Sequence, residues 1–168
     1  MKEYLLFDLD GTLTDSGPGI TKSVQYALHS FGIEEPDLKN LERFVGPPLR
    51  DSFKEFYGFE GEKAEAVIRK YRERYGKTGI FENCPYEGVP KMLKRLKKEG
   101  FHLAVASSKP QEYVEKVLAH FGIRQYFQVV VGGNMDGSGD KKSDIIKKVL
   151  AEFFPGRRAE KEKVYMIG

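Results

Sequence analysis

Cysteine is nearly absent from this chain of 168 residues, which contains only Cys84. One cysteine cannot form a disulfide within the chain, and such sparse use of cysteine is typical of a reducing compartment. Cys84 precedes Pro85 and has no second cysteine at the spacing of a redox or metal-binding pair. We therefore expect Cys84 to be a small packed thiol.

Long apolar runs and a strong charge of one sign are lacking as well. The first apolar segment, which begins at Tyr4, is too short for a signal peptide or a membrane helix. The 28 basic and 25 acidic residues are mixed along the chain, and their net charge of +3 does not indicate a nucleic-acid partner. These absences predict a cytoplasmic globular protein with no nucleic-acid or membrane partner, and they leave open whether it is a monomer or homodimer.

Four short apolar segments are present, and they do not alternate with polar residues. Such segments are expected of strands that are covered on both faces in a parallel sheet. A helical pattern precedes each of the last three, which predicts an α/β fold with a doubly wound, mostly parallel, Rossmann-like sheet. The predicted strands are residues 4–9, 101–106, 127–131 and 164–167, and the predicted helices are residues 89–99, 111–121 and 143–154.

Three helical patterns end at a glycine that is followed by an apolar residue. The glycines are Gly32, Gly100 and Gly122. This order is typical of the Schellman stop, in which the glycine is left-handed and the next residue folds back on the helix.

The segment between the first two predicted strands is too long for a simple crossover. It contains helical patterns at residues 20–31, 38–44, 49–57 and 63–75, separated by proline and glycine. We expect residues 16–84 to form an inserted helical lobe, and residues 1–15 and 85–168 to form the α/β core.

Polar residues follow the predicted strands where an open parallel sheet binds its ligands. Asp8 and Asp10 follow the first strand, Ser107, Ser108 and Lys109 follow the second, and Lys141 and Lys142 precede the last helix. A carboxylate such as Asp8 is costly to bury unless a cation compensates it.

The aspartates suit phosphate chemistry. Asp8 can attack phosphorus beside a divalent cation, while Asp10, on another side of the backbone, can transfer protons. Gly11 permits a sharp turn, and its amide and that of Leu9 can face phosphate oxygens. The alternative for Asp-x-Asp-Gly-Thr taken alone is an ordinary Asp-Gly turn after a strand.

The order of these motifs resembles that of the haloacid dehalogenase superfamily. Its first motif is similar to the run from Asp8 through Gly11 and Thr12 to Leu13, its second to the run from Val105 to Pro110, and its third to a lysine before Ser143. The inserted helices resemble the α-helical cap of the phosphoglycolate phosphatase-like subfamily.

The resemblance implies a Mg²⁺-dependent phosphatase that acts on a small phosphorylated metabolite, as a phosphoglycolate phosphatase or a 5'-nucleotidase does. It makes Asp8 the nucleophile and a metal ligand, Asp10 the acid and base and a second metal ligand through its carbonyl, and Ser107 the phosphate-binding hydroxyl. It makes Lys142 the neutralising lysine, because Lys142 fits the spacing to Asp144 better than Lys141 does. Gly11, Thr12 and Ser108 would also contact substrate.

Other assignments stay open at this point. Arg50, in the helical insertion, either contacts the remote part of the substrate or only belongs to a helix start. Lys109 either adds charge to the rim or caps the next helix. A sugar phosphomutase would use the same residues.

The superfamily's fourth motif is an acidic cluster, which would follow a run like Met166-Ile167-Gly168, the last residues of this chain. We therefore expect the C-terminal part of the core to be missing. A truncated or inactive binding protein of the same fold is a further alternative.

Overall fold

The computed structural model describes residues 3–156 and 163–168. The chain forms two compact units, one made of Met1–Thr14 with Pro85–Gly168 and the other of Asp15–Cys84. The first unit is an α/β unit and the second is a helical unit, and each is described by itself.

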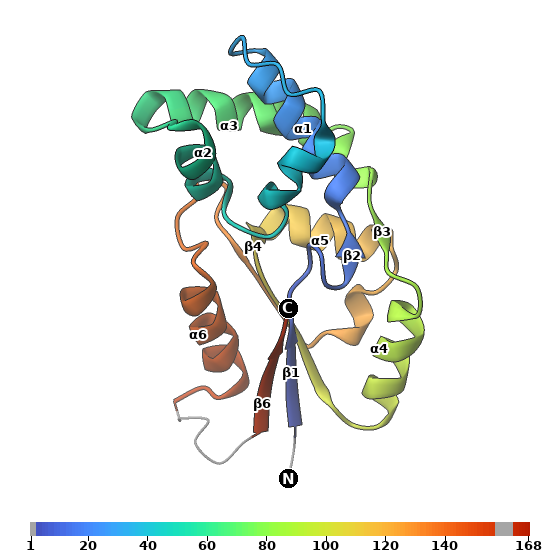
Figure 1. Ribbon diagram of the computed structural model, residues 1–168. Coiled ribbons are helices and arrows are strands. Elements are labelled where there is room, and N and C mark those ends of the chain that lie inside the picture. The colour runs from blue at the N-terminus through green and yellow to red at the C-terminus, as the bar shows by residue number, and fades with distance from the viewer. Residues whose placement is uncertain (1–2, 157–162) are drawn as a thin grey trace. The chain divides into compact units, whose positions relative to one another are not determined.

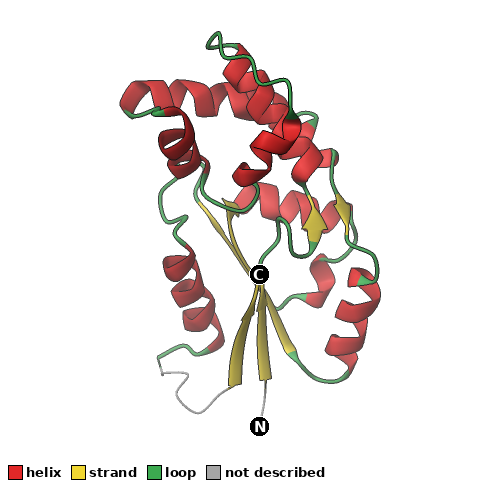
Figure 2. Ribbon diagram, in the orientation of Figure 1, coloured by secondary structure: helices red, strands yellow, loops and turns green. Residues whose placement is uncertain are grey.

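The α/β unit is built on a four-stranded sheet with the order β5-β4-β1-β6. Strands are drawn in yellow in Figure 2. The three strand pairs that make up this sheet are all parallel. The predicted α/β class with a parallel sheet is confirmed. The strands are β1 (Glu3–Phe7), β4 (His102–Pro110), β5 (Val129–Gly133) and β6 (Lys163–Ile167).

The direction in which the sheet grows reverses at β1. The chain adds β4 and then β5 on one side of β1, and it later adds β6 on the other side. In open parallel sheets such a switch point leaves a crevice at the carboxyl ends of the strands. Asp8 is the residue that follows β1, so it lies at the switch point.

The sheet of the α/β unit is covered on both faces. Figure 1 shows α6 (Lys142–Phe153) on one side of the sheet and α4 (Val89–Lys98) on the other. Tyr4, Leu6, Ala104 and Ala106 pack with Ile145 and Val149 of α6 in one buried cluster. Because side chains alternate along a strand, Leu5 and Phe7 point to the opposite face, where the Phe7 ring contacts Phe127. Coverage on both faces explains why the strands are continuously apolar.

The helix ends of both units follow the sequence prediction. Gly32, Gly100 and Gly122 have φ values of 74°, 87° and 63°. The amide of the residue after each glycine donates to a carbonyl five positions back, as from Ile33 to Leu28 and from Ile123 to Leu118. The three predicted Schellman stops are therefore confirmed. The helix that ends at Gly122 is α5 (Gln111–His120).

The helical unit contains α1 (Gly17–His29), η1 (Leu38–Phe44), α2 (Leu49–Tyr57), α3 (Gly61–Tyr75) and η2 (Gly79–Phe81). Its core includes Val24, Leu28, Phe44, Phe53 and Val67, all at most 1% exposed. Helix α1 begins three residues before the predicted Ile20, because Pro18 is well suited to a first helical turn.

The helix predicted at residues 38–44 has the predicted bounds, whereas one local expectation in this part of the chain was wrong. Residues 38–44 form a 3-10 helix, η1, which Asp37 caps by accepting a bond from the Lys39 amide. Cys84 is exposed rather than packed, because it belongs to a short surface strand, β3 (Cys84–Pro85). This strand pairs with β2 (Thr14–Asp15), so the chain passes between the units at one two-stranded ladder.

No helix in the described parts of the chain has the length and apolar content that crossing a membrane would require.

Candidate active site

Asp8 lies at the carboxyl end of β1 between two hydrogen-bond donors. The Lys142 Nζ atom is 2.7 Å from Asp8 Oδ2, and the Leu9 amide donates to Asp8 Oδ1 over 2.8 Å. The Asp8 side chain is 16% exposed, so its negative charge is only partly solvated. The nearby ammonium group therefore compensates a carboxylate that would otherwise be costly to hold there.

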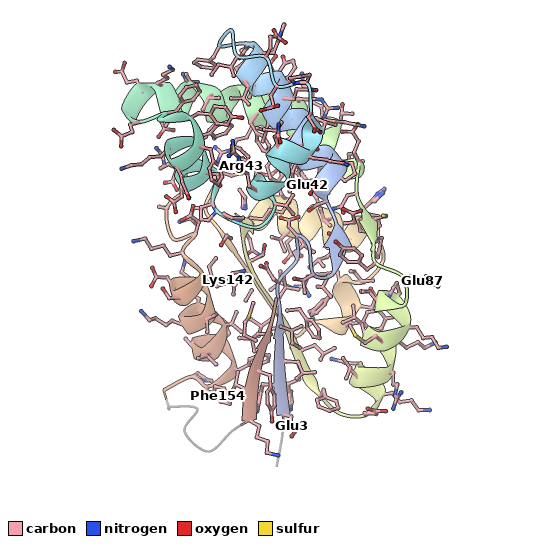
Figure 3. The ribbon with its side chains drawn as sticks, in the orientation of Figure 1. Glu3, Glu42, Arg43, Glu87, Lys142 and Phe154 are labelled. Atoms are coloured by element: carbon pink, nitrogen blue, oxygen red, sulfur yellow. The ribbon has the colours of Figure 1, made fainter. Side chains whose placement is uncertain are left out.

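Lys142 reaches this position because α6 begins with it. Lys141 is the residue before the first turn of α6, and its side chain is exposed. The Lys142 Nζ atom also donates to the Ala106 carbonyl of β4 over 3.0 Å, which links the ends of two neighbouring strands. Figure 3 shows Lys142 and Phe154 at opposite ends of α6. The structure thus brings Lys142, rather than Lys141, to Asp8.

The carboxylate of Asp10 forms an ion pair with Lys109, near the carboxyl end of β4. The Lys109 Nζ atom lies 2.8 Å from both carboxylate oxygens of Asp10. The Lys109 and Asp10 side chains are 5% and 8% exposed, so both charges are buried. The sequence left the role of Lys109 open between a rim charge and a helix cap. The structure favours a rim charge, because Pro110 precedes α5 and no side chain caps that helix.

Ser107 and Ser108 lie within β4 rather than after its end, because this strand runs on to Pro110. The regular ladder between β4 and β5 is interrupted between Ala106 and Pro110. The Ser107 hydroxyl accepts a bond from the Lys109 amide over 3.3 Å, and a hydroxyl that accepts one bond can still donate its proton. Ser107 and Ser108 are 1% and 9% exposed.

The backbone amides around the turn after Asp10 are engaged in local hydrogen bonds. The Gly11 amide donates to the Thr14 carbonyl over 2.9 Å, and the Leu9 amide is already engaged by Asp8. The expectation that these two amides face phosphate oxygens is therefore not met in this structure. Gly11 has a φ of 77°, so its function here is to allow the tight turn.

Gly168 and Thr12 adjoin Asp8. A Cβ atom built on Gly168 would lie 2.9 Å from the Asp8 Cβ and 3.5 Å from the Thr12 Oγ1. A side chain at position 168 would therefore displace Asp8. Arg50 belongs to the helical unit, where it forms an ion pair with Glu65.

Oxygen donors that suit a magnesium ion are present at Asp8 and Asp10. A carboxylate offers about four lone-pair positions, so the two bonds made to Asp8 leave capacity for a hard cation. The carboxylate of Asp10 is bound by Lys109, which leaves its carbonyl as the more suitable ligand. Within residues 3–156 and 163–168, no group of three or more His, Cys, Asp or Glu side chains is arranged to hold a metal ion.

Comparison with known protein families gives a match over residues 5–168 to the haloacid dehalogenase-like hydrolases. The chain belongs to the haloacid dehalogenase-like hydrolase family. The resemblance noted from the motifs is confirmed, and the family match covers both the α/β unit and the helical unit.

Relatives within this family carry several different names. The chain is 44% identical over 146 residues to a 5'-nucleotidase of Pseudomonas aeruginosa, covering 87% of this chain and 66% of that protein. It is 37% identical to the tyrosine-protein kinase PtkA of Mycobacterium tuberculosis, over 99% of this chain and 55% of that protein. It is 32% identical to a phosphoglycolate phosphatase of Aquifex aeolicus, over 98% of this chain and 74% of that protein. The chain thus spans between about half and three quarters of the length of these relatives.

A solved structure supports the fold of this family member. A predicted phosphatase from Clostridium acetobutylicum matches with a TM-score of 0.92 and 43% identity, over 98% of this chain and 75% of that chain.

Lys109 is the site residue whose role sequence reasoning could not assign. Its partner Asp10 lies 99 positions away in the chain, so no local pattern shows the pair. The only available signal was a lysine directly after two serines near the end of a strand.

Proposed function

We propose that this chain carries the active site of a Mg²⁺-dependent phosphoric monoester hydrolase that works through an aspartyl phosphate on Asp8. The observation that carries the proposal is the Asp8 carboxylate, which lies at the switch point of the sheet with the Lys142 ammonium at 2.7 Å. An ionised carboxylate beside a fixed cation can accept an anionic phosphate and attack its phosphorus atom.

The reaction has two steps. In the first, an Asp8 oxygen forms a bond to phosphorus, the bond from phosphorus to the ester oxygen breaks, and Asp10 gives a proton to that leaving oxygen. In the second, Asp10 takes a proton from water as the water oxygen attacks phosphorus, and the bond from phosphorus to Asp8 breaks. Inorganic phosphate and an alcohol are the products.

The other residues of the site bind and orient the substrate. Lys142 offsets the repulsion between Asp8 and the incoming dianion, and the hydroxyl of Ser107 donates to a phosphate oxygen. Thr12 and Ser108 supply further hydroxyl groups, and Gly11 forms the turn that carries Thr12. Mg²⁺ held by the Asp8 carboxylate and the Asp10 carbonyl would add positive charge beside the transferring group.

The proposed substrate is a small phosphorylated metabolite, in line with the names of the 5'-nucleotidase and phosphoglycolate phosphatase relatives. We assign the choice among such esters to the helical unit, including Arg50, because the residues of the α/β unit are concerned with the phosphate alone.

Asp8→Asn tests the proposal. The amide cannot attack phosphorus, so we expect turnover of a generic aryl phosphate to fall to below about a hundredth of the unmodified rate. Acid quenching with a labelled substrate should trap phosphate on the unmodified protein and none on the variant. Retention of more than about a hundredth of the activity, together with trapped label, would contradict the assignment of Asp8. Label that is passed to a sugar rather than to water would indicate a phosphomutase.

A further inference from the structure

The Lys109–Asp10 pair is the most deeply buried ion pair among those described in this chain, with side chains 5% and 8% exposed. The Lys142–Asp8 pair is more open, at 35% and 16% exposed. Two buried charges are retained only when their geometry is well matched, and here one ammonium group bonds both carboxylate oxygens at 2.8 Å. Such a contact fixes the rotation of the Asp10 carboxyl group as well as its position.

The chain around Lys109 is itself tightly held. Gln111, the first residue of α5, donates to the Val130 carbonyl of β5 and accepts a bond from the Gly132 amide. These bonds join the start of α5, directly after β4, to β5 where the ladder between β4 and β5 is interrupted. A Cβ atom on Gly132 would lie 2.6 Å from the Lys109 carbonyl oxygen, so the two backbones are in close contact. Lys109 therefore approaches Asp10 from a rigid segment.

We propose that Lys109 is a positioning residue, which holds the Asp10 carboxyl group in the orientation needed to protonate the leaving oxygen. This inference rests on the proposed phosphatase function. As the bond from phosphorus to the ester oxygen breaks, the proton passes from Asp10 to that oxygen. The carboxylate that remains is the species whose two oxygens the Lys109 ammonium binds. Lys109 thus acts through Asp10 and makes no contact with the phosphate in this role.

The role has a signature that depends on the leaving group. A phenolate that carries nitro groups leaves without a proton, whereas an unsubstituted phenolate or an alkoxide needs one. A residue that acts through Asp10 is therefore important for poor leaving groups and almost irrelevant for good ones. A residue that binds the phosphate group is equally important for both.

The test compares kcat/KM for phenyl phosphate and for 2,4-dinitrophenyl phosphate, because this constant covers the steps up to departure of the leaving group. We expect Lys109→Met to lower kcat/KM roughly a hundredfold with phenyl phosphate and less than about threefold with the dinitrophenyl ester. Asp10→Asn should show the same contrast, and adding Lys109→Met to Asp10→Asn should cause no further loss. Lys116→Met is the matched control, because Lys116 forms an exposed pair with Glu112 on α5.

Two further measurements distinguish a positioning role of Lys109 from a loss of activity that is caused only by altered folding. Lys109→Arg keeps the positive charge, so we expect it to recover part of the loss seen with phenyl phosphate. In the unmodified protein, the buried Lys109 ammonium should give a ¹H–¹⁵N signal that is protected from exchange, and Asp10→Asn should remove that protection.

The two proposals fail in different ways. An equal loss with both esters, or a further loss in the double variant, would overturn the positioning role and leave the phosphatase function intact. An unprotected Lys109 signal would likewise show that the pair is not formed. Absence of Asp8-dependent turnover of either ester by the unmodified protein would instead overturn the proposed function itself.

Discussion

The most buried of the described ion pairs in each unit differ in how deeply they are buried. In the α/β unit, the Lys109–Asp10 pair is almost fully covered. In the helical unit, Arg74 and Glu82 are 23% and 24% exposed, and Arg74 also donates to Ser23 of α1, so this pair joins α3 and α1 to the segment before β3. A buried pair is weak evidence of stabilisation, because desolvation offsets the attraction between its charges. We therefore assign the Lys109–Asp10 pair to chemistry and the Arg74–Glu82 pair to architecture.

The largest effect is expected from Lys142→Ala, which removes the more open of the two strand-end ion pairs of the α/β unit. Loss of the cation beside Asp8 leaves the approaching dianion uncompensated, and we expect kcat/KM for an aryl phosphate to fall roughly a thousandfold. Lys141→Ala is the control, because the exposed Lys141 precedes α6, and it should change kcat/KM little. The opposite result for the two lysines would move the catalytic role to Lys141.

Lys109→Met should also reduce stability, because it leaves the Asp10 charge buried without its ammonium partner. We expect the free energy of unfolding of the α/β unit to fall by about 3 kcal/mol in urea titrations followed by circular dichroism. The double variant Asp10→Asn with Lys109→Met should recover much of this loss, since neither charge then remains. Equal stability of the single variant and the unmodified protein would show that water compensates Asp10.

Glu82→Gln tests the architectural pair and should have the smallest effect. The hydrogen bond from Arg74, together with that from Lys22, holds the pKa of Glu82 below its ordinary value. The stabilisation is thus fully present above the ordinary glutamate pKa of about 4.3, and it is lost as the pH falls through the lowered value.

We expect Glu82→Gln to destabilise the helical unit by about 1 kcal/mol at pH 7 and to make no difference at a pH below both values. Urea unfolding of the variant and of the unmodified protein at the two pH values measures this difference in the free energy of unfolding. Glu112→Gln, at an exposed pair on α5, is the control. A loss that persists unchanged at low pH would mean that Glu82 stabilises the unit through packing.

Elements whose pattern is local could be predicted from the sequence. The continuous apolar run of β1 predicted a strand of a parallel sheet that is covered on both faces, and the glycine stop at Gly122 predicted how α5 ends. Helix α2 has the predicted bounds, Leu49–Tyr57, because proline precedes it and Gly58 takes the left-handed conformation at its end.

Features that depend on distant contacts could not be predicted. Strand β4 extends through Lys109, next to the bond from Gln111 to the Val130 carbonyl of β5, although Ser107 and Ser108 resemble a loop. The exposure of Cys84 follows from the pairing of β2 with β3, which joins segments about 70 residues apart, too far for a local pattern. Asp10 and Lys109 are likewise brought together only by the complete sheet.

The ladder of β2 with β3 has a consequence for how such proteins can diversify. Because the outgoing and returning strands pair with each other, the ends of the intervening helices are joined to the sheet through one short, regular connection. A recombination event that replaces everything between Asp15 and Cys84 needs only to preserve this junction. The strand order and the residues at the strand ends are then inherited unchanged. Under the proposed function, in which the helical unit sets substrate preference, that preference and the chemical mechanism can then evolve as separate traits.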